Sequence, residues 1–509
     1  MPAMAPTAPE YGPPLPVVKP STGLLAMAPS PTMEPMLAGA ARVDITPSLP
    51  VDVLGYVRRS VAPRMINDPL LATGVYLEDE GSAVVIIAAD LANLAPGYAD
   101  DVRGRVARSV DLAPERVLLN SSHTHAAPWP GASVKLGGET DAWTERELAY
   151  WEVLPEHFAS VAMHARESAR NARISGAVGH APDLAVNRRE RTADGRTILG
   201  WNPDGFVDDS VPTLRIDDLE GGAIATLVGF GCHPVVVGPD VPAAGSDFVG
   251  PLRRRVEELR GGVAVFLQGA AGNVLPLEAF FDRAGPEVAM GQRLGLEAAH
   301  AVADAEPLVT SVERLPFGSV TPISLYRRVF EDVQPAQVVG VAQEVVDLPL
   351  LEAPSVAEME TELAEREAEL ARRKAAGEDR VTTNPVTYHI AWLRLMMRTA
   401  ATGPLPTSVA GEIWAARLGD CAVVGTPGEI FGEIGSAVRE ASPASTTIFA
   451  GYCGGVLGYI ATPEEYPFGG YEPAVSHRGY GHPAPFSPAV AGIIRDTSVK
   501  LLEALFAET

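Results

Sequence analysis

Two of the ten histidines in this 509-residue chain occur as His123-Thr124-His125, directly after an apolar strand predicted over residues 116–120. In extended backbone, residues i and i+2 point the same way, so both imidazoles can face one site. His233 follows a second apolar strand, predicted over 223–230. Imidazoles bind transition metals and transfer protons. The pattern therefore fits either a metal-binding or proton-transfer site, or histidines that only make structural hydrogen bonds at the edge of a sheet.

A carboxylate and two phenols add to these imidazoles further along the chain. Glu429 lies in the motif Pro427-Gly428-Glu429, at a predicted strand-to-helix turn where a helix dipole would favour its ionised form. It would also serve as an ordinary first-turn residue of that helix. Tyr459 and Tyr471 fall in the Gly- and Tyr-rich stretch 451–481, which we interpret as an extensive surface loop that presents either ligands or packing residues.

Alternating strands and helices must position these groups. The predicted strands are 43–45, 75–77, 84–88, 116–120, 223–230, 263–267, 421–425 and one that begins at 448, and the predicted helices are 98–110, 144–171, 248–259 and 287–305. This alternation, with its hairpins, predicts an α/β fold with mixed sheets covered by helices. The buried run 84–89 ends at Asp90, which would either support a metal-bound imidazole or cap the next turn.

Charge and composition exclude several classes of function. The chain carries 40 Lys plus Arg against 64 Asp plus Glu, a formal net charge of −24, which repels nucleic acids and anionic membranes. No stretch approaches the roughly 20 apolar residues of a spanning helix, and three scattered cysteines form no disulfide framework. We therefore expect a soluble cytoplasmic protein that acts on a small molecule, contacts neither nucleic acid nor membrane, and forms either a monomer or a homo-oligomer.

Two regions differ from the α/β body. Residues 1–36 are rich in Pro and Ala without a signal-peptide pattern, so we expect a disordered arm before a single domain over 37–509. Within that domain, 352–402 predicts an inserted helical hairpin, because Ser355 and Glu358 form a capping box and Asn384-Pro385 would begin a second helix. The hairpin would be a lid, a dimer contact or a solvated surface excursion.

In their order along the chain, the motifs resemble those of the neutral/alkaline non-lysosomal ceramidase family, from about Ala38 to the last helix. The matching pieces are Ala41-Arg42-Val43-Asp44-Ile45-Thr46-Pro47, Gly55-Tyr56, Ala89-Asp90-Leu91, His123-Thr124-His125, Asn187-Arg188, Gly231-Cys232-His233-Pro234, Ser246-Asp247, Ala271-Gly272-Asn273, Pro427-Gly428-Glu429, Tyr459, Glu464-Glu465-Tyr466 and Tyr471. Each motif is short, and their shared order over most of the chain makes the resemblance specific.

The resemblance implies a neutral-ceramidase-like catalytic domain that binds zinc. The implied metal ligands are His123, His233, Glu429 and Tyr459. Imidazole and oxygen ligands with one open position suit Zn²⁺. The residues that match positions around the substrate head group and the oxyanion are His125, Arg188 and Tyr471. A donor or a cation there would stabilise the charge that develops during amide hydrolysis.

The chain departs from the family where the nucleophile should be. The family's serine lies three residues beyond an Ala-Gly pair, and here Leu275 takes that place in the segment 271–276. We also expect no C-terminal immunoglobulin-like domain. The hypothesis is a zinc-dependent hydrolase that cleaves an amide (C–N) bond of a small soluble substrate with metal-activated water in place of the serine. His125 or Asp247 would be the general base, and Asn273 would orient the substrate or bind an oxyanion.

Two alternatives stay open at this point. The same zinc-water chemistry would hydrolyse an ester or a lactone, because residue types do not distinguish these acyl substrates. A homologue without its nucleophile would also keep the metal for structure or for binding a small ligand. Retention of Arg188, His125 and Tyr471 favours an enzyme, since a purely structural zinc site would not need them.

Overall fold

The structure is a computed structural model that describes residues 36–53, 55–56, 62–129, 143–303, 305, 309–314, 326–330 and 338–507. The described residues belong to one compact unit, Pro35–Thr509. The predicted arm lies outside them except for Met36, which begins the first strand. Among the described helices, none is long and apolar enough to cross a membrane.

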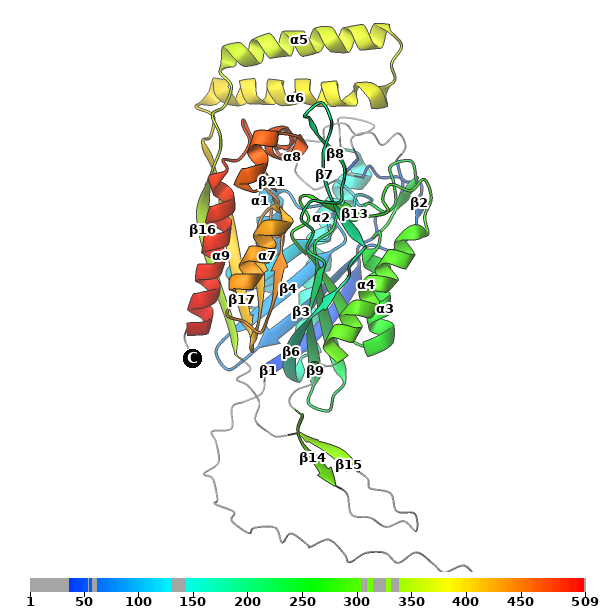
Figure 1. Ribbon diagram of the computed structural model, residues 1–509, viewed down its shortest axis with the longest axis vertical. Helices are drawn as coiled ribbons and strands as arrows, with labels where there is room; N and C mark the ends of the chain where they lie inside the picture. The colour runs from blue at the N-terminus through cyan, green and yellow to red at the C-terminus, as the bar shows by residue number, and fades with distance from the viewer. Residues whose placement is uncertain are drawn as a thin grey trace, which may run out of the picture. The chain divides into compact units, whose positions relative to one another are not determined.

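The largest element is a mixed eight-stranded sheet (Figure 1). Its strands, in spatial order, are β12 (Val263–Gln268), β10 (Ala223–Phe230), β9 (Ser210–Asp218), β6 (Arg170–His180), β1 (Met36–Asp44), β3 (Leu71–Glu78), β4 (Ala83–Ala89) and β5 (Val117–Ser121). The pairs β4/β5 and β10/β12 are parallel and the other pairs are antiparallel. The predicted α/β fold with mixed sheets is therefore confirmed.

A second sheet of four strands packs against the first. Its order is β16 (Val339–Pro349), β17 (Ser408–Leu418), β18 (Cys421–Gly425) and β20 (Thr446–Ala450), with β18 and β20 parallel. The smaller sheets pair β2 (Met65–Ile66) with β11 (Ala243–Ala244), β7 (Ala185–Arg191) with β8 (Thr197–Asn202) and β13 (Val274–Pro276), β14 (Val309–Arg314) with β15 (Tyr326–Phe330), and β19 (Glu429–Ile430) with β21 (Tyr459–Ile460).

Helices cover the outer faces of both sheets, which gives four layers. The large sheet is covered by α1 (Pro96–Ser109), α2 (Glu145–Glu167), α3 (Val249–Arg260) and α4 (Pro286–Ala303), and the second sheet by α7 (Gly432–Ala441) and α9 (Ala489–Ala507). Alternate residues of β4 show the consequence: Val84 and Ile86 pack in the core between the sheets with Trp414, while Val85 and Ile87 pack beneath α1 and α2. The sequence of a strand that is buried on both faces is a continuous run of apolar residues.

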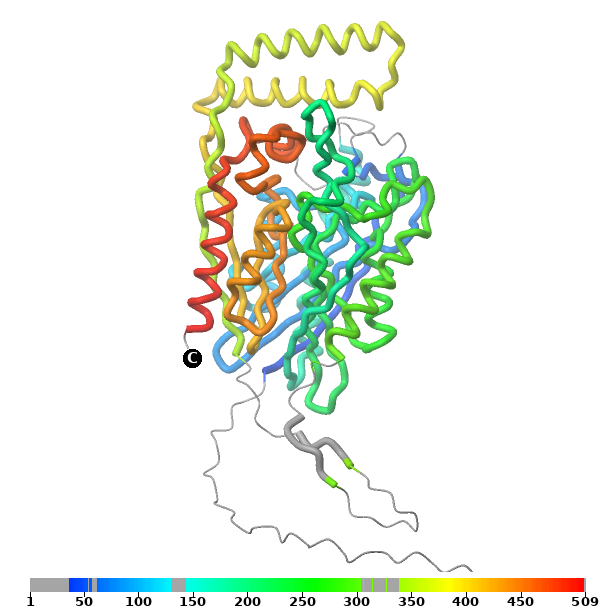
Figure 2. Tube along the Cα trace, viewed as in Figure 1, coloured from blue at the N-terminus to red at the C-terminus, as the bar shows by residue number. Residues whose placement is uncertain are grey.

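The helices of the predicted insertion are present, and one boundary differs. The first, α5 (Val356–Ala375), begins with the predicted capping box of Ser355 and Glu358. The second, α6 (Arg380–Thr402), begins before the predicted Asn384, because the Asp379 side chain accepts a hydrogen bond from the Thr382 N–H and caps the helix there. The two helices lie side by side across one end of the molecule, beyond α8 (Tyr471–Ala474) (Figure 2).

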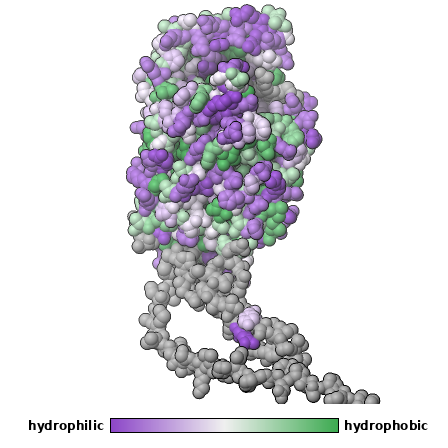
Figure 3. All heavy atoms as spheres, viewed as in Figure 1, coloured by the Kyte–Doolittle hydropathy of each residue, from purple (hydrophilic) through white to green (hydrophobic). Residues whose placement is uncertain are grey.

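The hairpin contacts the body through its second helix. The Trp392 indole N–H donates to the His482 carbonyl at 2.8 Å, and Arg478 lies 3.2 Å from His389. Hydrophilic side chains gather on the outward side of this end of the molecule (Figure 3). Val356 is the exposed apolar exception near the start of α5. The hairpin therefore has a solvated outer side and an inner side fastened to the segment that follows α8.

Sequence reasoning left out several antiparallel strands. The predicted helix 144–171 ends at Glu167, and the chain enters β6 at Arg170. The strands β6, β9, β16 and β17 carry mixed patterns of buried and partly exposed residues. Such patterns are weaker signals than the fully apolar runs of β4 and β5, because a strand with partly exposed residues has no continuous apolar run.

The buried end of β4 is held by an ion pair. Asp90 accepts hydrogen bonds from both terminal nitrogens of Arg253 in α3, at 2.8 and 2.5 Å, and from the Leu71 N–H. Both side chains are almost fully buried. Asp90 therefore neither contacts a ligating imidazole nor acts as a simple turn cap. It fixes the turn after β4, whose Leu91 carbonyl accepts the His123 N–H.

Replacing Arg253 by methionine should leave the Asp90 carboxylate in the core without its ion-pair partner. We expect Arg253→Met to lower the free energy of unfolding by about 3–5 kcal/mol, because a buried charge loses its partner. The matched control is Arg105→Met, whose partner Glu156 is solvent-exposed, and it should cost much less, because exposed ion pairs contribute little to stability. Urea denaturation measures both, and equal losses would contradict this account of Asp90.

Candidate metal centre

The first two histidines emerge from the carboxyl end of β5. His123 adopts a left-handed backbone conformation, with φ of 64°, which turns its ring back toward the strand ends. Its Nδ1 lies 2.6 Å from the Ala92 carbonyl oxygen. A carbonyl oxygen only accepts hydrogen bonds, so Nδ1 carries the proton and Nε2 keeps its lone pair. The Nε2 of His125 lies 3.2 Å from the Nε2 of His123.

His233 arrives from the carboxyl end of β10 and is held in the same tautomer. Its Nδ1 lies 2.8 Å from the Ala271 carbonyl and 3.1 Å from the Val274 carbonyl, which again leaves a lone pair on Nε2. The candidate ligand nitrogens of His123, His125 and His233 all lie within 4.8 Å of one another. The structure thus brings together three histidines that are 110 residues apart at their widest.

Glu429 completes this cluster from the short two-stranded sheet of β19 and β21. Its Oε2 lies 3.3 Å from the Nε2 atoms of both His123 and His233. The predicted local structure was wrong: Glu429 belongs to the short strand β19, which pairs in parallel with β21, and the following helix α7 begins only at Gly432. A helix dipole therefore does not set its charge. Desolvation raises the pKa of Glu429, but His123 and His233 together outweigh it and hold the pKa well below its usual range.

Three tyrosines surround the carboxylate and one imidazole. Tyr452 donates to Glu429 Oε2 at 3.3 Å, Tyr480 donates to Oε1, and the Tyr459 hydroxyl lies 3.4 Å from His233 Nε2. Tyr459 is only 8 % exposed and lies in β21, so its predicted place in a surface loop was wrong. Burial raises the pKa values of Tyr452, Tyr459 and Tyr480, so all three remain phenols that can donate.

Sequence reasoning gave no role to Tyr452, Tyr480 or two buried amides that tie the strand ends together. Asn120, at the end of β5, donates to the Gly451 carbonyl at 2.6 Å and accepts from the Gln268 N–H at 2.9 Å. Gln268, at the end of β12, donates to the carbonyls of Ser122 and Cys232. The sequence signal that could have identified these two amides is a polar residue at the end of an apolar strand. These bonds set the spacing between the two histidine segments.

A buried ion network holds Arg188 beside the imidazoles. The Arg188 Nε donates to Glu472 Oε1 at 2.8 Å, and Arg189 donates to Glu472 Oε2 at 2.5 Å. The Arg188 Nη1 lies 3.2 Å from His233 Nε2. Desolvation lowers the pKa of Arg188, but Tyr459 and Glu472 outweigh it, so the guanidinium stays charged. Glu472 is a further residue that sequence reasoning did not identify, although it follows Tyr471 directly.

Two of the imidazoles, those of His233 and His125, are held in the uncharged form. Burial, together with the Arg188 charge, lowers the pKa of His233 to about 3. Burial and the neighbouring His123 and His233 hold the pKa of His125 well below its usual value. Neutral imidazoles are the form that binds metal ions and accepts protons.

Of the remaining predicted site residues, Tyr471 lies at the edge of the cluster and Asp247 binds backbone N–H groups. The Tyr471 ring centroid lies 5.5 Å from that of Tyr459, and its side chain is 38 % exposed. The Asp247 carboxylate accepts from the backbone N–H groups of Val236, Val237 and Phe248. Its role as general base stays a prediction, and these contacts give it the separate task of fixing the turn after His233.

Asn273 and Leu275 also have packing partners. The Asn273 side chain donates to Glu433 at 2.9 Å and accepts from the Gly432 N–H at 2.9 Å, so it joins its loop to α7. Its proposed role toward the substrate is not tested by these contacts. Leu275 is buried in a small apolar cluster with Val186 and Val235. A leucine there offers no hydroxyl for attack.

Two glycines permit close approaches that the site requires. Gly55 has a φ of 115°, and a Cβ there would lie 2.2 Å from the Cγ of His125. A Cβ on Gly272 would lie 2.4 Å from the Glu429 carbonyl oxygen. Any larger residue at either position would displace the imidazole or the strand that carries the carboxylate.

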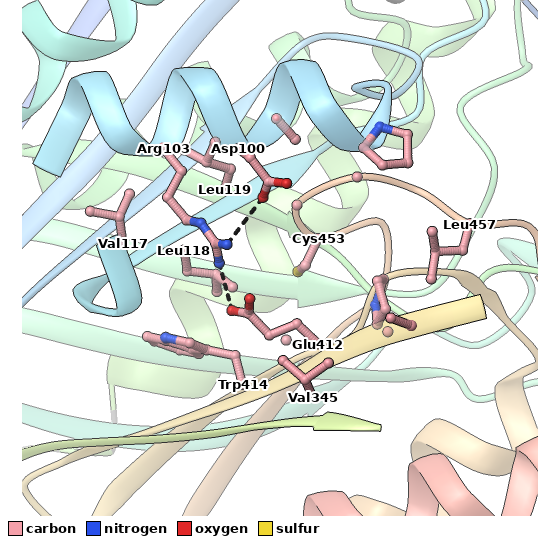
Figure 4. A pocket seen from close by; sticks show the side chains of 18 residues that line it. Asp100, Arg103, Val117, Leu118, Leu119, Val345, Glu412, Trp414, Cys453 and Leu457 are labelled. Carbon is pink, nitrogen blue, oxygen red and sulfur yellow. Dashed lines mark hydrogen bonds and ion pairs between the residues drawn. The ribbon is translucent and has the colours of Figure 1, made fainter. Parts of the chain in front are cut away.

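A cavity of about 220 Å³ lies between α1 and the second sheet, lined by residues that include Arg103, Glu412 and Trp414 (Figure 4). Arg103 of α1 pairs there with Asp100 at 3.1 Å and with Glu412 at 2.6 Å, and Cys453 and Leu457 form part of its wall. The described residues that line it include none of the three clustered histidines. This cavity is therefore distinct from the candidate metal centre.

The donor set fits a divalent transition metal. The Nε2 atoms of His123 and His233 both face the same oxygen of the Glu429 carboxylate, so either a proton or a metal ion must lie between each nitrogen and that oxygen. The residues that would hold the ion are His123, His233 and Glu429, with His125 and Tyr459 near enough to contribute. Imidazole with oxygen ligands suits Zn²⁺.

Fold and site together define a four-layer α/β protein with a candidate metal centre at the carboxyl ends of strands from both sheets. Two ceramidases are among the solved structures that share this fold. Neutral ceramidase from Pseudomonas aeruginosa aligns with a TM-score of 0.64 and 18% identity, over 93% of this chain and 74% of that one. A ceramidase complexed with C2 aligns with a TM-score of 0.64 and 17% identity, over 93% of this chain and 76% of that one.

These likenesses show that the chain has the neutral ceramidase fold. No family model matches the sequence, and no curated protein matches it at a significant level.

Metal content tests the cluster directly. We expect wild-type protein, dialysed against zinc and then against metal-free buffer, to retain about one zinc ion per chain by mass spectrometry, because His₂Glu sets bind zinc tightly. His233→Ala/Glu429→Ala should retain none. The matched control is His180→Ala/Asp209→Ala, a surface histidine–carboxylate pair, which should bind as wild type does. Equal zinc in both double variants would place the ion elsewhere.

The carboxyl of Asp247 gives a separate prediction. Burial raises its pKa from 3.8 to about 7 in the folded protein. The unfolded chain loses this proton first as the pH rises, so wild-type stability falls between about pH 4 and pH 7 relative to a variant that does not titrate.

Urea unfolding should be measured for wild type and Asp247→Asn at pH 5.5 and pH 8. Relative to wild type, the free energy of unfolding of the asparagine variant should be higher at pH 8 than at pH 5.5. A constant difference in the free energy of unfolding would mean that the folded carboxyl is ionised throughout.

Proposed function

We propose that this protein is a metal-dependent hydrolase that cleaves the amide bond of a small soluble substrate with water as the nucleophile. The observation that carries the proposal is the convergence of three imidazoles and the Glu429 carboxylate on one buried point, in a fold shared with neutral ceramidases. A zinc ion bound there would lower the pKa of water and polarise a carbonyl oxygen.

The chain's own residues prepare this chemistry. Backbone carbonyls hold the Nδ1 protons of His123 and His233, so neither ring has to change tautomer to present Nε2. Tyr452 and Tyr480 donate to Glu429 and keep its carboxylate in place. A site whose groups are already oriented loses little free energy to reorganisation when it reacts.

His125 is the favoured proton acceptor. It is uncharged, and its Nε2 lies 3.2 Å from His123 Nε2 at the point where the ligands converge. Asp247 is the weaker candidate, because its oxygens accept three backbone N–H groups. Arg188 is a fixed cation beside the same point and would bind an anionic group there, either a developing oxyanion or a charged group of the substrate. Tyr471 lies at the edge of the histidine cluster.

Water takes the role of the nucleophile because the corresponding position offers no hydroxyl. Leu275 stands where the resemblance places a serine, and its side chain packs against Val186 and Val235. Attack by water then needs a proton acceptor and a polarised carbonyl, but no acyl-enzyme.

A panel of soluble amides, esters and lactones tests the proposal. We expect the zinc-loaded protein to hydrolyse at least one amide, with kcat falling at least about 100-fold after chelation and returning when zinc is restored. His125→Ala should lower kcat about 10²- to 10⁴-fold, as expected for a lost general base. Asp247→Asn should cost much less, and His180→Ala, on the exposed surface, should change nothing.

Two outcomes would redirect the proposal. Turnover of esters or lactones alone would mean that the protein hydrolyses one of these bonds instead of an amide. Silence across the whole panel, with zinc bound, would favour a non-catalytic protein that binds a ligand.

A further inference from the structure

The guanidinium of Arg188 has donors that the protein does not use. Its Nε is bound to Glu472 and its Nη1 faces His233 Nε2, but the buried Nη2 has no hydrogen-bond acceptor among the described residues. The side chain is only 5 % exposed, so water does not readily serve this nitrogen. A buried donor without a partner costs about 1–3 kcal/mol, and more when it is charged. The orphaned nitrogen therefore indicates a ligand atom.

Metal binding would release a second donor on the same edge of the guanidinium. His233 has one lone pair on Nε2, because its Nδ1 proton is held by backbone carbonyls. An ion that takes this lone pair leaves Arg188 Nη1 without its acceptor. Nη1 and Nη2 then form an open fork, the geometry that binds the two oxygens of a carboxylate.

The local charge balance also favours an anion. Arg188 and Arg189 share the single carboxylate of Glu472, while Glu465 pairs with Arg189 and Arg191. Three guanidinium groups thus share two carboxylates in this network, and the charge of Glu429, which also acts on Arg188, would be offset by a bound divalent cation. The net charge of −24 on the whole chain opposes this only weakly, since exposed charges beyond about 8 Å are screened at physiological salt.

The fork is also held rigidly. Glu472 fixes Nε, and the Arg188 Cζ lies 5.3 Å from the centre of the Tyr459 ring. Glu472 is itself anchored by Arg189, whose other nitrogens bind Glu465 and the Gly469 carbonyl. A cation immobilised before the ligand arrives loses little entropy on binding.

From these contacts we propose that the substrate carries a carboxylate that binds the Nη1–Nη2 edge of Arg188. Because Nη1 lies 3.2 Å from the imidazole nitrogen that would bind the metal, the carboxylate must be close to the scissile carbonyl. An N-acyl α-amino acid meets this condition, since three bonds separate its two carbonyl carbons. The inference rests on the proposed function and narrows it to one substrate class.

Matched substrates test the inference without changing the protein. N-acylglycines with acyl groups of two, six and twelve carbons are compared with the corresponding N-acylglycinamides, which lack only the charge. Charge-assisted hydrogen bonds contribute about 1.5–3 kcal/mol, so kcat/KM should be about 10- to 150-fold higher for the best acylglycine than for its amide. Equal or faster turnover of the neutral amide would overturn the carboxylate site and leave the hydrolase intact.

Variants assign the preference to one side chain. Arg188→Met should remove the preference for the carboxylate, and Arg188→Lys should reduce it, because an ammonium is a point charge without the fork. The matched control is Arg196→Gln on the same β7–β8 hairpin, an exposed residue paired only with Asp194, which should keep the full preference. A preference that survives Arg188→Met in folded protein would also overturn the inference.

Binding separates this inference from the proposed function. 4-Oxononanoate is N-hexanoylglycine with a methylene in place of the amide nitrogen, so it cannot be hydrolysed at that position. Calorimetry on zinc-loaded protein should show it binding at least about 10-fold more tightly than 4-oxononanamide. Selective binding without turnover of any acylglycine would sustain the carboxylate site and reject the hydrolase. Equal affinities, or no binding of either compound, would contradict the site.

Discussion

The structure of the centre depends on two backbone hydrogen bonds. The Ala92 and Ala271 carbonyls hold the Nδ1 protons of His123 and His233, which forces both Nε2 lone pairs toward the same oxygen of Glu429. Nitrogen and carboxylate oxygen atoms that face each other in a buried place need a proton or a metal ion between them. The tyrosines, the arginine network and the two close-packed glycines all serve to keep these atoms at that point.

The fold makes this convergence possible because strands from two sheets end at one place. The parallel pairs β4/β5, β10/β12 and β18/β20 all point their carboxyl ends toward the cluster, the position where open α/β sheets commonly place their sites. Asn120 and Gln268 connect these ends through buried amide hydrogen bonds. The histidines follow strands of the large sheet, whereas Glu429 and Tyr459 lie in the small β19/β21 sheet and Tyr452 follows β20 of the second sheet. A change in the packing of the sheets would therefore separate the ligands from one another.

Much of this arrangement was predictable from the sequence, and the exceptions have physical causes. Fully apolar runs such as Val84–Ala89 identified the buried strands, and the order of the motifs indicated His123, His233 and Glu429. The surroundings of Glu429 were not predictable, because a two-residue strand such as β19 leaves no pattern. Tyr452 was also missed as a partner of Glu429, since its left-handed backbone, with φ of 53°, points it back from the end of β20. Glu472 and Asp90 form buried ion pairs with residues far away in sequence, which spacing cannot reveal.

The most direct test of the metal centre is the anomalous scattering of crystals of the zinc-loaded protein, measured on both sides of the zinc absorption edge. The account predicts one strong peak that appears only above the edge, within about 2.3 Å of the Nε2 atoms of His123 and His233 and of an oxygen of Glu429. A zinc peak at any other place, or no peak among these three side chains in protein that contains zinc, would contradict it.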